Sequence, residues 1–223
     1  MPWRKMGDAV KHTPLVLLVA AVVLASGCSD IERSRDLANP KVAPITLAHQ
    51  VCSNCHGFAG TTVSPNFPNL AGQTEAYLVA QLTAFKSHDR LDPAGFEYMW
   101  GLSRSLSEDQ IKGLAAYYAA QTPGSQKFEG DRARLEAGKS IYEAGVAAAG
   151  VPACSGCHGA KGEGNATFPR IAGQHVDYLV KQLIVFQRTD ERPEGAVMKP
   201  IAHSLSRQNI DDVARYLQAM PSL

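Results

Sequence analysis

The sequence has no marked excess of charge of either sign. It contains 22 Lys and Arg against 21 Asp and Glu, a formal net charge of +1 at pH 7, with no basic stripe and no acidic tail. A nucleic-acid-binding chain clusters positive charge, so we expect no nucleic-acid partner. Disorder is also excluded, because 45% of the residues are apolar and 19 Gly with 13 Pro are ordinary numbers. A chain of 223 residues can form one or two compact domains.

Two further patterns are missing. No segment alternates β-branched and polar residues, so strands should be absent or trivial and the fold all-α. The apolar run from Leu15 to Ala25 is too short to cross a hydrocarbon core of about 30 Å as a mature helix. This run follows the positive residues Arg4, Lys5 and Lys11. The N-terminus is therefore typical of an export signal.

Small residues stand directly before Cys28 and resemble the lipobox of bacterial lipoproteins, in which this cysteine is lipidated and becomes the first residue. The usual Leu three positions earlier is Ala25 here. The alternative is an exported protein whose signal is cut elsewhere. We expect a lipoprotein signal peptide over residues 1–27, a polar tether over 28–46, and a periplasmic protein anchored to a membrane through Cys28.

The rest of the chain contains the same pattern twice, which indicates two homologous domains. The segment Cys52–Gly57 reads CSNCHG and recurs 102 positions later as CSGCHG. The segment FPNLAGQ, which begins at Phe67, recurs as FPRIAGQ from Phe168. We place domain 1 at residues 47–122, a linker at 123–131 and domain 2 at 132–223.

Periodicity and capping residues predict matching helices in both repeats. One helix begins after Gln73 or Gln174 and has Tyr-Leu, Leu and Phe on one face. Another begins at Ser107 or Ser206. A long helix from about residue 132 to 149 leads into the second motif. Long irregular loops follow each motif, and a small helical domain of this kind needs a large group at its centre.

Each repeat contains Cys-x-x-Cys-His, the attachment signature of c-type haem. The two thiols add across the vinyl groups of the haem, and the adjacent histidine is the proximal ligand of the iron. We therefore predict two haem c groups, bound covalently through Cys52, Cys55, Cys154 and Cys157, with His56 and His158 as iron ligands.

Other roles for these cysteines are weaker. A zinc site would have to join pairs that are 98 residues apart, where about 12–20 is usual. A thioredoxin-like redox pair would need a βαβ setting, which the sequence does not show. Disulfides are compatible with export, but they do not require a histidine after each pair.

Two methionines are candidates for the sixth iron ligand. Met99 and Met198 follow their motif histidines by 43 and 40 residues, on matching loops before the last helix of each repeat. A thioether ligand stabilises ferrous iron and closes it to substrates. We therefore expect Met99 and Met198 to be axial ligands and expect no catalytic residue. The alternative is that both methionines are core residues.

The proximal histidines also need a backbone acceptor for the Nδ1 proton. The segments containing Pro68 and Pro169 are the candidates. Among the other histidines, His203 lies five residues from Met198 and is a possible replacement ligand. We expect packing or surface roles for His49, His88, His175 and His203.

The ordered set of motifs resembles the cytochrome c4 family, over about residues 45–222. The resemblance implies two tandem class I-like cytochrome c domains related by a pseudo-twofold axis, with low-spin haems whose propionates face each other. It implies that His56 and Met99 hold the first iron and that His158 and Met198 hold the second. It also implies electron transfer between the membrane respiratory chain and terminal oxidases. The lipobox departs from the family pattern.

We therefore expect a dihaem electron carrier, not an enzyme, whose partners are a redox protein donor and a terminal oxidase or reductase, with no small-molecule substrate. The net charges of −2 over residues 52–122 and +1 over 154–223 favour different partners at the two domains. One alternative is an electron-transfer subunit of a larger dehydrogenase or oxidase complex. Another is a haem enzyme with one open iron.

Overall fold

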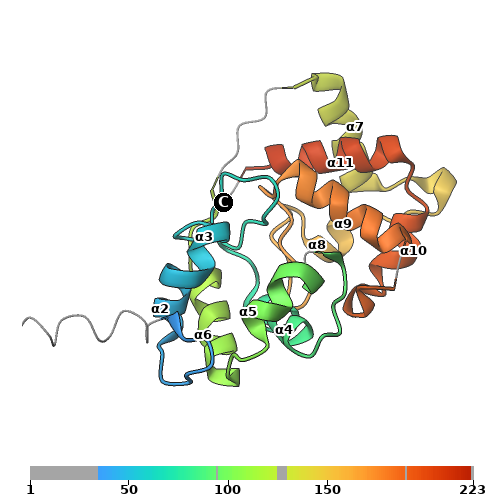
Figure 1. Ribbon diagram of the computed structural model, residues 1–223. Helices are drawn as coiled ribbons and strands as arrows, with labels where there is room; N and C mark the ends of the chain where they lie inside the picture. Colours follow the sequence, from blue (N-terminus) through green and yellow to red (C-terminus); the bar gives the residue numbers. More distant parts are fainter. Residues whose placement is uncertain (1–34, 94, 125–129, 189, 222–223) are drawn as a thin grey trace, which may run out of the picture.

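Two groups of helices follow one another along the chain and lie side by side (Figure 1). The computed structural model describes residues 35–93, 95–124, 130–188 and 190–221. Within these ranges there are no strands, and the only β contacts are the isolated bridges Val146–Val151 and Asn165–Phe168. The predicted all-α fold with two tandem domains is confirmed. The predicted signal peptide and Cys28 lie outside the described residues.

The first domain is built from short helices around the motif and two longer helices. The longer ones are α4 (Glu75–Lys86) and α6 (Glu108–Ala119). The short ones are α2 (Pro44–Leu47), the π-helix η2 (Ala48–Cys52), α3 (Ser53–His56), the π-helix η3 (Gly95–Met99) and α5 (Trp100–Ser103).

The second domain repeats this plan with an additional long helix at its start. The long helices are α7 (Arg132–Ala144), α9 (Val176–Arg188) and α11 (Arg207–Ala219). The short ones are the 3-10 helices η4 (Ala147–Ala149) and η5 (Pro193–Gly195), with α8 (Ser155–His158) and α10 (Met198–His203).

The last helix of each domain begins with a capping box. The Ser107 hydroxyl accepts a hydrogen bond from the Gln110 backbone N–H at 3.1 Å, and the Gln110 side chain accepts one from the Ser107 N–H at 3.0 Å. Ser206 and Asn209 form the same pair in the second domain. These boxes satisfy backbone groups that would otherwise lack partners. The helix starts predicted at both serines are confirmed.

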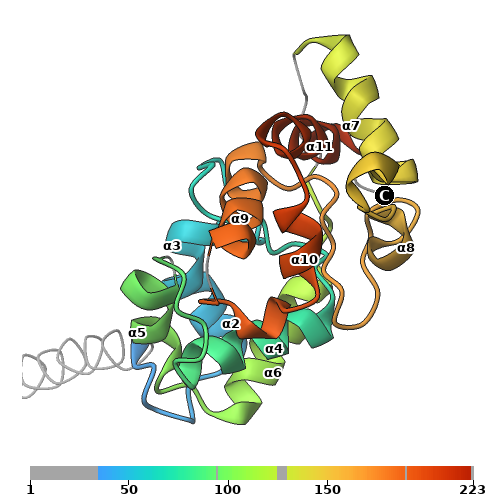
Figure 2. The same ribbon diagram turned by 90° about the vertical axis from the view of Figure 1, so that its right-hand side faces the viewer.

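Each domain has its own hydrophobic core. Leu47, Leu114 and Tyr118 are buried in the first core, and Tyr142 and Ile210 are buried in the second. In the second domain α7 crosses α11, as both views show (Figures 1 and 2).

Two segments differ from the sequence-based expectations. The helix expected to reach residue 149 ends at Ala144, because Gly145 has a φ of 76° and a Cβ there would lie 2.2 Å from the Val151 carbonyl oxygen. The predicted tether, residues 28–46, is not separate from domain 1 along its whole length. Leu37 and Val42 in its later part pack against the first core.

Candidate functional site

Both cysteine-histidine motifs lie on a short helical turn that ends in a glycine. In the first domain η2 continues directly into α3, which ends at His56; in the second, α8 ends at His158. Residues at i, i+3 and i+4 share one face of a helix, so both cysteines and the histidine of a motif face the same side. Gly57 has a φ of 78°, and a Cβ there would lie 2.1 Å from the Thr61 carbonyl oxygen. Glycine therefore lets the chain turn away directly after the histidine.

The returning loop fixes the orientation of each histidine. His56 Nδ1 lies 3.0 Å from the Pro68 carbonyl oxygen, and His158 Nδ1 lies 2.9 Å from that of Pro169. Both rings are more than nine-tenths buried. The contact assigns the proton to Nδ1, which leaves Nε2 unprotonated to bind a metal. The acceptors proposed from the sequence are confirmed.

Burial also favours the neutral form of these rings. Removal from water lowers the pKa of His56 and of His158, and the proline carbonyl opposes this effect only in part. A neutral imidazole is the form that ligates iron. Phe67 and Phe168 pack edge-on against the two rings, with centroids 6.2 and 6.3 Å away.

The four cysteines of the motifs are free thiols in the described protein. Burial raises the pKa of Cys52 and of Cys154 to about 11, so these thiols stay protonated near neutral pH. Within the described ranges, no group of three or more His, Cys, Asp or Glu side chains could hold a metal ion.

The two methionines occupy matching places, but on helices and not on the loops expected from the sequence. Met99 ends η3, which continues into α5, and both segments pack against α4. Met198 begins α10, which packs against α9. Both side chains are half-buried, whereas His203 at the end of α10 is exposed.

His49 and His175 have packing roles. His49 Nε2 lies 2.9 Å from the Tyr117 hydroxyl, and its ring stacks on Phe58. His175 is buried and its Nε2 lies 3.0 Å from the Thr62 carbonyl oxygen of the other domain. The sequence did not indicate this contact between domains.

The FPNLAGQ loop of domain 1 and the FPRIAGQ loop of domain 2 bind each other reciprocally. The Gln73 amide bonds the backbone of Arg170, donating to its carbonyl at 2.9 Å and accepting from its N–H at 2.6 Å. The Gln174 amide bonds Asn69 in the same way, at 3.0 and 2.9 Å. Both glutamines are buried. The bonds pair equivalent residues of the two domains, as the pseudo-twofold axis implied by the family resemblance requires.

A second interdomain contact is a buried polar network. Arg90 forms an ion pair with Asp92 at 2.6 Å, and both side chains are at most 4% exposed. Burial alone would raise the pKa of Asp92, but the hydrogen bond and charge of Arg90 lower it. Arg192 donates to the amide oxygens of Gln182 and Gln81 at 2.5 and 3.0 Å. Sequence reasoning missed these residues, although the glutamines recur at the repeat offset.

The donor set of each domain fits a covalently bound haem. Two thiols precede a buried, neutral histidine whose Nδ1 is fixed and whose Nε2 forms no hydrogen bond within the described part of the chain. A thioether occurs at the same place in both domains, on a segment packed against the long helix that follows the motif loop. Each domain therefore has the residues that covalent attachment of a haem and ligation of its iron require.

Comparisons with known proteins agree with this geometry. The cytochrome c family model matches residues 46–120 and 135–221, once per domain. Cytochrome c4 of Azotobacter vinelandii is 38% identical over 179 residues, which are 76% of this chain and 84% of the relative. A Stutzerimonas stutzeri protein named thiosulfate dehydrogenase electron acceptor is 42% identical over 209 residues, 92% of this chain and 93% of the relative. The solved structure of Acidithiobacillus ferrooxidans cytochrome c4 is 39% identical, with a TM-score of 0.69, and covers 75% of this chain and 97% of that chain.

The duplicated motif, the oriented histidines and these similarities lead to one conclusion. The chain belongs to the cytochrome c family and, within it, to the dihaem cytochromes c4, which hold two covalently bound haem c groups and transfer electrons.

Proposed function

We propose that each domain holds its haem iron between the motif histidine and the methionine that precedes the last helix. His56 and Met99 are the pair of the first domain, and His158 and Met198 are the pair of the second. The matching positions of the methionines support this assignment. The bound haem supplies an iron that gains and loses one electron.

The protein's own residues prepare this site for electron transfer. The Pro68 and Pro169 carbonyls hold the Nδ1 proton and aim Nε2 into the haem site. Burial of both histidines keeps water from the proximal side. The reciprocal glutamine bonds hold the two domains in one relative position, which would keep two bound haem groups in a constant arrangement for electron transfer. The carrier function rests on the pair of oriented histidines in two domains joined by these bonds.

The carrier exchanges electrons with a redox protein donor and with a terminal oxidase or reductase. Among the described residues, most large apolar side chains that are exposed belong to domain 1: Ile45, Phe58, Val63, Leu91, Phe96, Tyr98 and Leu102. Three of them lie within three residues of Met99. One partner docks at the exposed apolar residues next to Met99, so Tyr98→Lys should slow electron exchange with one partner and leave the other unchanged.

A second candidate function is electron acceptance from a thiosulfate dehydrogenase. The 42% identity with the Stutzerimonas stutzeri acceptor, over 93% of that protein, favours it. Stopped-flow reduction of both haems by such a dehydrogenase and thiosulfate, at a rate that saturates with enzyme, would support this function. Reduction no faster than by thiosulfate alone would exclude it.

The protein works outside the cytoplasm, anchored through a lipid on Cys28. The apolar run and small residues before Cys28 support this location. Among the described residues, no helix has both the length and the apolar character needed to cross a bilayer. Cys28→Ala should release the holoprotein from membranes without changing its haem content. An unchanged membrane fraction would exclude the lipid anchor.

The ligand assignment is tested by replacing each methionine separately. Met99→Ala should open one reduced haem to carbon monoxide, and Met198→Ala should open the other, while the untouched haem keeps its spectrum. A variant that binds no carbon monoxide would exclude that methionine as a ligand. Carbon monoxide binding by the unmodified protein would instead favour a haem enzyme with one open iron.

A further inference from the structure

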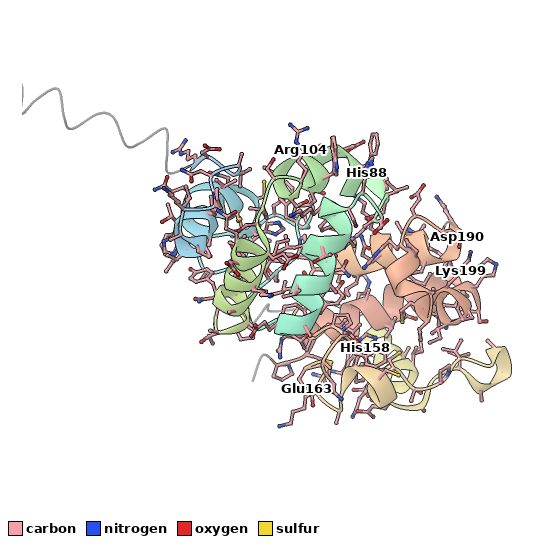
Figure 3. All side chains as sticks on the ribbon, turned by 90° about the horizontal axis from the view of Figure 1, so that it is seen from below. His88, Arg104, His158, Glu163, Asp190 and Lys199 are labelled. Carbon is pink, nitrogen blue, oxygen red and sulfur yellow. The ribbon has the colours of Figure 1, made fainter. Side chains whose placement is uncertain are left out.

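In both domains the residue after the methionine contacts the turn that follows the preceding long helix, and we call this contact a tie. In domain 1 the ring of Trp100 stacks on His88, with centroids 5.0 Å apart and planes 29° apart. In domain 2 Lys199 forms an ion pair with Asp190. Figure 3 shows His88 and Arg104 together on one domain and Asp190 beside Lys199 on the other. The ties are equivalent in place and different in chemistry.

The domain 1 tie is a stack of three aromatic rings beside an arginine. His88 lies between Trp100 and Phe96, whose centroid is 5.6 Å away at an interplanar angle of 21°. The Arg104 guanidinium lies 5.2 Å from the centroid of the Trp100 ring. Phe96 is on η3 and Trp100 is on α5, so His88 contacts the segment on both sides of Met99.

The backbone holds His88 in this place. His88 follows α4 with a φ of 63°, in the left-handed region, and its N–H bonds the Phe85 carbonyl at 3.2 Å. A non-glycine residue in this region needs surrounding structure to maintain it. The stack is therefore anchored to the C-terminal end of α4.

The domain 2 tie is an exposed ion pair. The Asp190 side chain is 85% exposed and that of Lys199 is 43% exposed. Val197, on the other side of Met198, is also exposed. Exposed ion pairs are weak and are screened by salt, whereas ring stacking carries no net charge to screen.

We propose that these ties set how firmly each methionine holds its iron: the His88 stack braces Met99 independently of salt, and the Asp190–Lys199 pair holds Met198 only at low salt. This inference rests on the proposed ligation by Met99 and Met198. His88 and Lys199 act through the methionines and are positioning residues.

Ligand exchange in the oxidised full-length holoprotein tests the proposal, with imidazole as the probe. Imidazole nitrogen replaces the thioether sulfur, the iron stays ferric, and the released methionine stays neutral. Two phases should appear. Between about 10 mM and 1 M NaCl the fast phase should accelerate about 1.5- to fivefold, and the slow phase should not change.

Variants of domain 1 identify the slow phase. His88→Ala should accelerate it about two- to tenfold, the factor expected for loss of an aromatic contact. His88→Phe keeps a flat ring and should restore the unmodified rate. Glu97→Ala is the control, because it removes an exposed side chain of η3 two residues before Met99 that is outside the stack.

Variants of domain 2 identify the fast phase. Lys199→Ala should give, at low salt, the rate that the unmodified protein shows at high salt, and it should remove the salt dependence. Lys181→Ala, at an exposed lysine of α9, is the control and should change neither.

Several results would overturn the proposal. They are an unchanged slow phase in His88→Ala, equal rates for His88→Phe and His88→Ala, and salt dependence that persists in Lys199→Ala. Failure of the methionine assignment is detected separately, before imidazole is added. The oxidised protein would then lack the near-infrared absorption of an iron–thioether bond.

Discussion

The reciprocal glutamine bonds should control whether the two domains stay docked. Gln73 and Gln174 each satisfy one backbone N–H and one backbone carbonyl of the opposite domain. Changing Gln73 to alanine leaves the buried N–H and carbonyl of Arg170 without partners, and changing Gln174 to alanine does the same to the part-buried groups of Asn69. Each buried group costs about 1–3 kcal/mol, so Gln73→Ala weakens docking by about 2–6 kcal/mol while the interface remains closed, and Gln174→Ala weakens it by less.

The loss of docking free energy cannot exceed the free energy with which the two domains dock. When the penalty exceeds the docking free energy, the domains separate and water satisfies the exposed groups. The second substitution then adds little, so the Gln73→Ala and Gln174→Ala effects should be strongly non-additive in a double-mutant cycle. Other contacts, such as that of His175 with Thr62, still connect the domains in the single variants.

Small-angle X-ray scattering and calorimetry of the holoprotein measure the effect. The double variant should have a larger radius of gyration, should unfold in two transitions and should transfer electrons between haems more slowly, with both haem spectra unchanged. Gln121→Ala is the control, because Gln121 bonds a backbone carbonyl of its own domain at 2.8 Å. An unchanged radius and one cooperative transition in the double variant would refute the reasoning.

Other substitutions test packing and capping. Gly138→Ala should destabilise domain 2 by about 1–3 kcal/mol in thermal unfolding, because the new Cβ would lie 2.1 Å from a backbone oxygen of α11. Gly101→Ala is its control and should not destabilise domain 1, because a Cβ at Gly101 would have no atom within 4 Å. Ser206→Ala should cost about 1 kcal/mol in urea unfolding through loss of the α11 cap. Asp92→Asn should cost about 3 kcal/mol, because it leaves the buried charge of Arg90 without its carboxylate. An effect below 0.5 kcal/mol for any of these destabilising changes would contradict its stated cause.

Local sequence signals predicted the parts of the site that depend on short spacing. The Cys-x-x-Cys-His motifs predicted two haem c groups, and the sequence also predicted the proline carbonyls that contact His56 and His158. The serines before the last helices specified where those helices begin, because a capping box is complete within four residues. The internal repeat specified the domain number. In each case the interacting groups are close in sequence.

Contacts between distant residues were not predictable in this way. Gln73 and Arg170 are 97 positions apart, and nothing local marks them as partners. The packing of Leu37 and Val42 against the first core was also missed, because these residues show no helical stripe and are covered only in the folded domain. The end of α7 depends on how closely Gly145 approaches the Val151 carbonyl, which is a property of the folded loop.

Carbon monoxide binding to the reduced holoprotein tests the central claim most directly, combined with a count of covalently bound haem per chain. If both haems are six-coordinate, the protein should contain two haem c groups per chain, and carbon monoxide should not change its absorption spectrum. A single haem per chain, or a spectrum that shifts for one haem, would contradict the account of two closed electron-transfer sites.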